Sequence, residues 1–338
     1  MPAKNILEIK DDFDVFVFDI YGVIWDGKKV IAGFDEVMKI LTQSGKRVVI
    51  MSNSTALSPA QETVYAGRGF LRGVHYERLV TSGDAAEDAF SHVEHATTGT
   101  IVEVSKRSRK QQPPVPFNTT SLQAAAAAEG ISPARTMRIA ESLYMSGFIS
   151  YPRVDNTVYP RSLDLEGIVK GLSSGSPALA PVCKKVLAGP MKPTRGKTET
   201  TDHPPIHPTG QGDPETLDGG QKKLYNLIAR RFLATLMGPA TIENTKLAID
   251  VAGEPFTATG DVLVDPGFRE AYPYGLKRDE QLPALAQGDV IDVHDIKLEA
   301  KQTEPPARYS QGKLVQEMEK RGLGTKSTRA SIIERLYT

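Results

Sequence analysis

The chain has 338 residues, which is long enough for two or three domains. Hydrophobic residues make up 40% and charged residues 24%, as in ordinary folded proteins, which excludes wholesale disorder and collagen-like structure. No apolar run approaches the roughly 18 residues of a membrane span, and the N-terminus lacks a signal-peptide pattern. The single cysteine, Cys183, excludes an intramolecular disulfide framework and a Cys-based zinc site. We therefore expect a protein of the reducing cytoplasm with no membrane partner.

The net charge of zero conceals an uneven distribution. Residues 1–100 hold 10 Lys and Arg against 14 Asp and Glu, and residues 101–338 hold 31 against 27. This difference permits an anionic partner for the second part and says nothing about the fold.

The first ninety residues alternate between strand and helix patterns. Short apolar runs at 14–20, 47–51 and 78–82 are typical of buried parallel strands. Apolar residues at helical spacing predict a helix at 34–44, and a second helix begins with Ser58 as its N-cap. This βαβαβ order predicts a parallel doubly wound sheet that binds ligands at the carboxyl ends of its strands.

The pattern changes after about residue 93. A short strand is followed by a basic run at 105–110 and a proline-rich connector. Next comes a helix with five consecutive alanines, which form helix well but bring little apolar bulk. Ser132 caps a further helix, which ends at Gly147. The segment 171–220 is rich in Gly, Pro, Ser and Thr, and we expect loops around short elements there.

The remaining chain mixes helix and strand patterns. A helix with Arg230 and Arg231 is expected at 221–238, and alternating runs in 246–300 predict strands of an antiparallel sheet. The last 28 residues read as two helices joined by GLGTKST. The sequence stops within a helical pattern and without a C-cap, as expected for a fragment.

An acid and a hydroxyl follow two neighbouring strands of the first part. Asp19 ends the first strand and Ser52 ends the second, at the edge where such sheets bind ligands. This pair suits attack by the Asp19 carboxylate on phosphorus, with Ser52 hydrogen-bonding the phosphoryl oxygens and Mg²⁺ bridging Asp19 and the phosphate. Alternatively, the acid merely ends a strand and the serine caps a turn.

Residues 1–93 resemble the front of a haloacid dehalogenase superfamily phosphatase. The matching residues are DIYGVIWDG from Asp19, SNS from Ser52 and TSGDAA at 81–86. The resemblance implies Asp19 as nucleophile, Ser52 as phosphate binder, and a small phosphorylated substrate. Such phosphatases usually carry a second Asp two residues after the nucleophile. Here that position is Tyr21, which resembles the dehalogenating members of the superfamily. The family's Lys and later acidic pair are not identifiable before residue 93, so we expect a truncated Rossmann-like core.

Tyr151 and Arg153 form a second candidate constellation. Tyr151 precedes a proline and is therefore held extended, so Arg153, two residues on, shares its face. The free phenol has a pKa of about 10, and a neighbouring cation would stabilise both a phenolate and the oxygens of a pentacoordinate phosphorus. The alternative is a tyrosine that packs against its own helix.

Four longer motifs around this pair occur in order. They are PPVPFNTTSLQ, GFISYPRVDN, TDHPPIHPT and PPARYSQGKLVQEMEKRGLGTKSTRASII. They resemble the type IA DNA topoisomerases, most closely the archaeal kind, over about residues 94–338. The resemblance implies Tyr151 as the nucleophile that forms a 5′-phosphotyrosyl bond with one DNA strand. It also implies active-site roles for Arg153, Asp155 and His203, although His203 could instead cap the turn before Pro204.

The tail adds a predicted phosphate site. Ser327 and Thr328 stand where a helix begins, so that backbone N–H groups point outward, and Lys326 and Arg329 flank them. The resemblance to type IA topoisomerases implies that this segment binds a DNA phosphate. Arg195 and Lys197 complete the cations expected to bind single-stranded DNA. An ordinary αα-hairpin is the alternative for the tail.

The two resemblances predict a multidomain α/β plus α+β chain. Its expected parts are a truncated βαβαβ core at 1–93, a β-rich gate domain at 94–117 and 211–304, an α/β tyrosine domain at 118–210, and the start of a DNA-binding helical domain at 305–338. Topoisomerases of this type cleave DNA with Mg²⁺ held by acidic residues of an N-terminal Toprim domain, and no such pattern is evident at 1–93.

The chain therefore reads as a join of two partial proteins. We expect an ATP-independent type IA topoisomerase that is incomplete and does not relax supercoiled plasmid by itself. The alternatives are a single-stranded DNA-binding fragment without catalysis and a phosphatase acting through Asp19.

Overall fold

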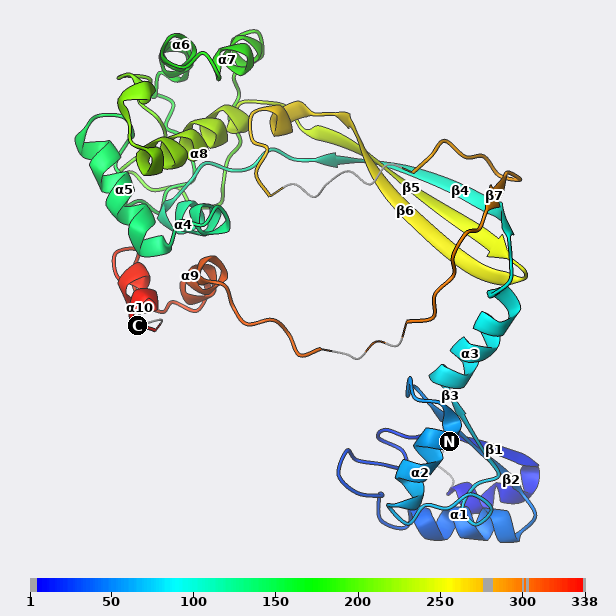
Figure 1. Cartoon of the computed structure of the whole chain (residues 1–338). Coiled ribbons are helices and arrows are strands. Elements are labelled where there is room, and N and C mark those ends of the chain that lie inside the picture. Colours follow the sequence, from blue (N-terminus) through cyan, green and yellow to red (C-terminus); the bar gives the residue numbers. More distant parts are fainter. Residues whose placement is uncertain (1–4, 276–281, 300, 302–303, 337–338) are drawn as a thin grey trace. The chain divides into compact units, whose positions relative to one another are not determined.

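The computed structural model describes residues 5–275, 282–299, 301 and 304–336. The chain divides into two compact units (Figure 1). The first unit comprises residues 1–104, 247–258 and 285–305, and the second comprises residues 105–246, 259–284 and 306–338. None of the described helices is long and apolar enough to cross a membrane.

The first unit contains the predicted βαβαβ arrangement. Its three strands pair in parallel in the order β1-β2-β3. The elements are β1 (Val15–Asp19), α1 (Phe34–Gln43), β2 (Arg47–Ser52), α2 (Ser58–Ala66), β3 (Arg78–Thr81) and α3 (Ser82–Val93), preceded by the 3-10 turns Ile6–Glu8 and Lys10–Asp12. Side chains alternate along each strand, so Phe16 and Phe18 of β1 and Ile50 of β2 are buried in one core with Met38 and Leu41 of α1.

The predicted N-cap at Ser58 is wrong. Leu57 is the N-cap of α2 and makes no side-chain cap, while Ser58 is the first helical residue. The backbone N–H of Ser58 donates instead to Asp84 Oδ1 at 2.8 Å, and Asp84 Oδ2 also accepts from the N–H of Thr81. The acceptor comes from a distant part of the chain, so the local pattern pointed to the wrong cap.

The second sheet has the strand order β6-β5-β4-β7. Its strands are β4 (Thr98–Gln111), β5 (Ala240–Val251), β6 (Glu254–Asp265) and β7 (Val290–Asp292). β4 and β7 are antiparallel, and a two-residue turn at Ala252 and Gly253, both at positive φ, joins β5 to β6. The basic run expected to follow a short strand lies inside β4. Lys106 pairs with Glu243 at 3.2 Å and Arg109 with Asp261 at 3.0 Å.

Helices form most of the second unit. They are α4 (Thr119–Ala128), α5 (Pro133–Met145), α6 (Leu165–Gly175), α7 (Ala180–Leu187), α8 (Gly219–Thr235), α9 (Gln311–Lys320) and α10 (Arg329–Leu336), with 3-10 turns at Pro214–Thr216 and Gly267–Glu270. Helix α8 lies within the core and buries Leu224, Ile228 and Phe232. Within 118–210, where an α/β domain was expected, the secondary structure is helical apart from the isolated bridges that Ile206 makes to Phe117 and Pro208 makes to Ile149.

Candidate active site around Tyr151

The segment that carries Tyr151 follows α5 and is fixed on both sides. The hydroxyl of Ser150 accepts from the N–H of His207 at 3.0 Å, and the N–H of Ser150 donates to the His207 carbonyl at 2.9 Å. After the tyrosine, the hydroxyl of the fully buried Thr119 accepts from the N–H of Val154 at 2.8 Å. The backbone around Tyr151 is therefore held by segments that lie far away in sequence.

The ring of Tyr151 is half-buried between two other rings. Tyr144 of α5 meets it edge to face, with ring centroids 5.4 Å apart. The ring of the exposed His203 lies on it at a tilt of 48°, with centroids 4.8 Å apart. These contacts restrict the direction in which the phenol points, and they bring together two residues expected to share a site.

The position of His203 depends on Asn156, which sequence reasoning missed. The buried side-chain amide of Asn156 donates to the carbonyls of Thr200 at 2.9 Å and His203 at 3.0 Å. Its oxygen accepts from the N–H of Val158 at 2.9 Å. No local pattern signals this role, because the partners become neighbours only in the folded chain.

Arg153 is held by a carboxylate that was also not anticipated. Its Nε donates to Oε1 of Glu141 at 2.8 Å, and its Nη2 donates to the same oxygen. Glu141 lies on α5, one turn before Tyr144. Glu141 and Tyr144, which both contact the tyrosine segment, thus lie on one face of one helix.

Asp155 joins the tyrosine segment to the loop before α10. Its carboxylate pairs with Nζ of Lys326 at 3.0 Å. The pKa of the exposed Asp202 carboxyl lies below its usual range, mainly because the Thr200 hydroxyl donates a hydrogen bond to it. The positive charge of Lys326 lowers this pKa further. Lys326 is therefore at the predicted site, with two carboxylates near its ammonium group.

The cations Arg195 and Lys197 lie on a loop that packs against the same segment. A Cβ on Gly196 would stand 2.1 Å from Thr157 Oγ1, so only glycine fits this close approach. The N–H of Gly196 also donates to the Thr157 carbonyl at 2.9 Å. Arg195 pairs with Glu199 at 2.8 Å, and Lys197 is exposed.

The tail residues have two different environments. Ser327 and Thr328 are exposed, and the Thr328 hydroxyl accepts from the N–H of Thr325 at 2.9 Å. Arg329 is only 8% exposed, and its guanidinium donates to the carbonyls of Leu323 at 3.1 Å and Gly324 at 3.3 Å. It also contacts Glu319 of α9. In this structure the guanidinium donors contact groups of the protein itself. The expected contact of Arg329 with a DNA phosphate stays a prediction.

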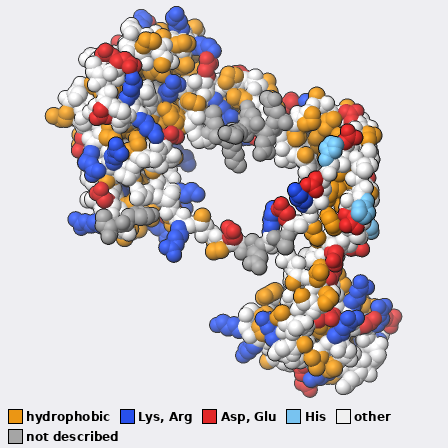
Figure 2. All heavy atoms as spheres, in the orientation of Figure 1, with side chains coloured by type: hydrophobic (Ala, Val, Ile, Leu, Met, Phe, Trp, Pro, Cys, Tyr) orange, Lys and Arg blue, Asp and Glu red, His pale blue; other side chains and the backbone are white. Residues whose placement is uncertain are grey.

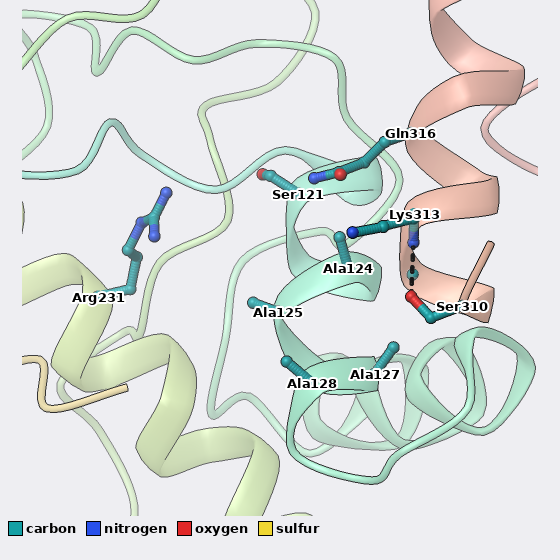
Figure 3. A pocket seen from close by; sticks show the side chains of 10 residues that line it. Ser121, Ala124, Ala125, Ala127, Ala128, Arg231, Ser310, Lys313 and Gln316 are labelled. Carbon is teal, nitrogen blue, oxygen red and sulfur yellow. Dashed lines mark hydrogen bonds between the residues drawn. The ribbon is translucent and has the colours of Figure 1, made fainter. Parts of the chain in front are cut away.

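A groove of about 440 Å³ lies between α4, α8 and α9 (Figure 3). The alanines of α4 line one side of the groove, and their small side chains leave the groove open. Arg231 of α8 and Lys313 of α9 add cationic walls. The lining residues are Ser121, Ala124, Ala125, Ala127, Ala128, Arg231, Ser310, Gly312, Lys313 and Gln316. Figure 2 shows further Lys and Arg side chains over the visible surface of the helices, interleaved with acidic ones.

In the first unit, Asp19 and Ser52 end the neighbouring strands β1 and β2, as the sequence suggests. Asp19 is exposed, and its Oδ1 accepts from the N–H of Ile20 at 2.8 Å. Ser52 is buried, and its hydroxyl accepts from the N–H of Ser54 at 3.2 Å. Tyr21 is 69% exposed.

The described residues do not by themselves form a site for the expected Mg²⁺. Among them, no group of three or more His, Cys, Asp or Glu side chains could hold a metal ion. Two carboxylates of this region are paired with cations, since Glu141 contacts Arg153 and Asp155 contacts Lys326.

Comparison with known proteins identifies relatives of most of the chain. Residues 61–338 match a family model described as DNA topoisomerase. The match starts within α2, and the expected boundary at residue 93 stays a prediction. DNA topoisomerase 1 of Archaeoglobus fulgidus is 42% identical over 257 residues, which are 76% of this chain and 38% of that protein. This chain therefore spans little more than a third of that relative.

Solved structures give a similar result. Full-length topoisomerase I from Thermotoga maritima aligns with a TM-score of 0.57 and 27% identity, over 77% of this chain and 43% of that one. A haloacid dehalogenase-like hydrolase from Brucella suis covers 26% of this chain and 33% of that one at 24% identity, and its TM-score of 0.24 is too low to support a shared fold.

Proposed function

Because the chain belongs to the type IA DNA topoisomerase family, we propose that Tyr151 is the nucleophile that breaks and reseals one DNA strand. The observation that carries the proposal is the packing of Tyr151 between Tyr144 and His203, with Arg153 on the same extended segment. A half-buried phenol with a fixed direction and a cation two residues along the same segment suit attack on a phosphodiester.

The reaction balances without an external energy source. Tyr151 Oη attacks phosphorus, the P–O3′ bond breaks, and the 5′ phosphate becomes attached to the tyrosine. The phenol proton leaves, and the 3′ oxygen gains a proton as it departs. Resealing is the reverse attack by the 3′ hydroxyl, so the energy of the phosphodiester is kept in the tyrosyl link and no ATP is consumed.

The surrounding side chains suit distinct steps of this exchange. Arg153 would stabilise the negative oxygens on phosphorus, and His203 would hold or pass a proton beside the phenol. Asp155 would keep Lys326 at the site, where its ammonium group would contact a strand phosphate. Ser327 and Thr328 would extend this contact along the strand, with Arg195 and Lys197 on the neighbouring loop.

We place this chemistry in the tyrosine domain at 118–210 and treat 94–117 and 211–304 as the gate domain, with 305–338 beginning the DNA-binding helical domain. The groove between α4, α8 and α9 would accept part of the strand, because its alanines leave room and Arg231 and Lys313 supply positive charge. Relaxation of supercoiled DNA is proposed for the whole protein, of which this chain corresponds to a part.

Label transfer tests the proposed chemistry. The chain is mixed with a single-stranded oligonucleotide in a magnesium buffer, and the mixture is denatured with detergent. A label at the 3′ end of the DNA is expected on the protein, whereas a label at the 5′ end is not, because only the 5′ phosphate of the downstream piece is attached. Transfer of the 5′ label alone would contradict the proposed polarity.

Binding of single-stranded DNA is expected to be modest and sensitive to salt. Three or four phosphate contacts give a slope of log affinity against log salt of roughly −2 to −3, at about 0.7 per contact. Lys326→Ala removes one contact and should make the slope less steep by about 0.7. Fluorescence anisotropy of a labelled oligonucleotide across a salt series measures both values.

Lys185→Ala is the matched control, since it removes one cation of α7 that pairs with Glu270 at 2.7 Å. It should leave the slope unchanged. Arg329 is unsuitable for this comparison, because its removal would disrupt the buried contacts with Leu323 and Gly324. Equal slopes for Lys326→Ala and the parent would exclude Lys326 from the DNA contact.

For the first unit, we propose that the resemblance to phosphatases is not accompanied by turnover. Asp19 and Ser52 stand where nucleophile and phosphate binder would be needed, but position 21 is a tyrosine and supplies no carboxyl group for proton transfer. Negligible phosphate release from aryl or sugar phosphates is expected in the presence of Mg²⁺. A robust rate that Asp19→Asn abolishes would instead establish a phosphatase.

A further inference from the structure

Helix α5 contacts the tyrosine segment through two side chains that are one turn apart. Glu141 holds Arg153, and Tyr144 packs on Tyr151. Residues i and i+3 lie on one face of a helix, and residues i and i+2 lie on one face of an extended segment. The two contacts together therefore fix how α5 is aligned along the tyrosine segment.

The contact between Glu141 and Arg153 leaves one part of the guanidinium available. Nε and Nη2 both donate to Oε1 of Glu141, so the carboxylate occupies the side edge of the planar group. Arginine has five N–H donors in a rigid fork, and this contact does not involve the Nη1 end. Exposed fractions of 26% for Arg153 and 44% for Glu141 show that the pair is open to solvent and to a ligand.

Resting on the function proposed above, we propose that Glu141 is a positioning residue. It fixes Arg153 by the side edge, so that the Nη1 end is presented to the phosphate attacked by Tyr151. Without Glu141, the long arginine side chain would sample several rotamers. The entropy lost on ordering it would then add to the activation free energy of the reaction. Glu141 itself does not touch the DNA.

A carboxylate close to an anion site also has an opposing effect, and the two effects predict different results. If the charge of Glu141 mainly repelled the phosphate, removing it would tighten binding. If Glu141 mainly orients Arg153, removing the side chain slows the reaction, whereas an uncharged side chain that still accepts a hydrogen bond preserves the rate. The pair Glu141→Gln and Glu141→Ala separates these effects.

The experiment measures, on the full chain, the single-turnover rate of 3′-label transfer at saturating oligonucleotide and the affinity for the same oligonucleotide. Glu141→Ala is expected to lower the rate by about 10- to 100-fold, because small displacements of the groups at a reacting centre have effects of this size. The affinity should change little. Glu141→Gln should stay within about threefold of the parent, because its side-chain oxygen still accepts from Arg153. Glu141→Asp should lie between them, because the shorter acid draws the guanidinium back.

Glu166→Ala is the matched control, since it removes one acidic side chain of α6 that pairs with Lys170 at 2.6 Å. It should change neither rate nor affinity. Tighter binding by both Glu141→Gln and Glu141→Ala, or an unchanged rate in Glu141→Ala, would overturn the positioning role. Absence of any Tyr151-dependent adduct in the parent would instead overturn the proposed function, so the two failures are distinguishable.

Discussion

Replacing Tyr151 with phenylalanine is expected to abolish covalent attachment of the chain to DNA. The substitution removes the only atom that the proposed step attaches to phosphorus, so 3′-label transfer should fall by at least about 10³-fold. The ring is kept, and with it the contacts with Tyr144 and His203. The free energy of unfolding should therefore change by less than about 0.5 kcal/mol, and binding of single-stranded DNA should persist.

The control for this experiment is Tyr309→Phe. Tyr309 is 54% exposed and precedes α9, so its hydroxyl is accessible without being part of the site. This variant should transfer label at the rate of the parent. An adduct that survives in Tyr151→Phe and disappears in Tyr309→Phe would show that the nucleophile is a different tyrosine. Circular dichroism confirms that both variants fold.

Elements whose cause is local were the most predictable. The strands β1 to β3 and helix α1 follow from apolar spacing within a few residues, and Ser132 caps α5 through its own neighbour Arg135. The basic run of β4 failed to look like a strand because its neutralising acids are remote. Glu243 lies 137 residues from Lys106, and Asp261 lies 152 residues from Arg109.

The candidate site divides in the same way. Motifs pointed to Tyr151, His203 and Lys326. The folded chain packs His203 on the Tyr151 ring and pairs Lys326 with Asp155, and the roles of these residues stay predictions. Glu141 and Asn156 are ordinary in sequence, and their contacts exist only after α5 and the loop before His203 have packed. Arg329 is a separate case, since its guanidinium contacts the protein interior and its predicted phosphate contact stays a prediction.

The largest expected effect on stability comes from Asn156→Ala. The substitution removes two donated hydrogen bonds, to the Thr200 and His203 carbonyls, and one accepted from the N–H of Val158. Each such bond contributes about 0.5 to 1.5 kcal/mol, and a buried group left without a partner costs about 1 to 3 kcal/mol. The free energy of opening this region should therefore fall by about 2 to 4 kcal/mol.

Hydrogen exchange is the suitable measurement, because a chain of two units need not unfold in one step. In Asn156→Ala, amides within 156–158 and 198–203 should exchange faster, while those of α8 should keep their protection. Asn244→Ala is the matched control, because it removes a single side-chain hydrogen bond, to Asp261 at 2.9 Å, and should cost less than about 1.5 kcal/mol. Since His203 loses its anchor, 3′-label transfer should also slow in Asn156→Ala but not in Asn244→Ala. Unchanged exchange at 198–203 would mean that His203 is held by its contact with the Tyr151 ring rather than by Asn156.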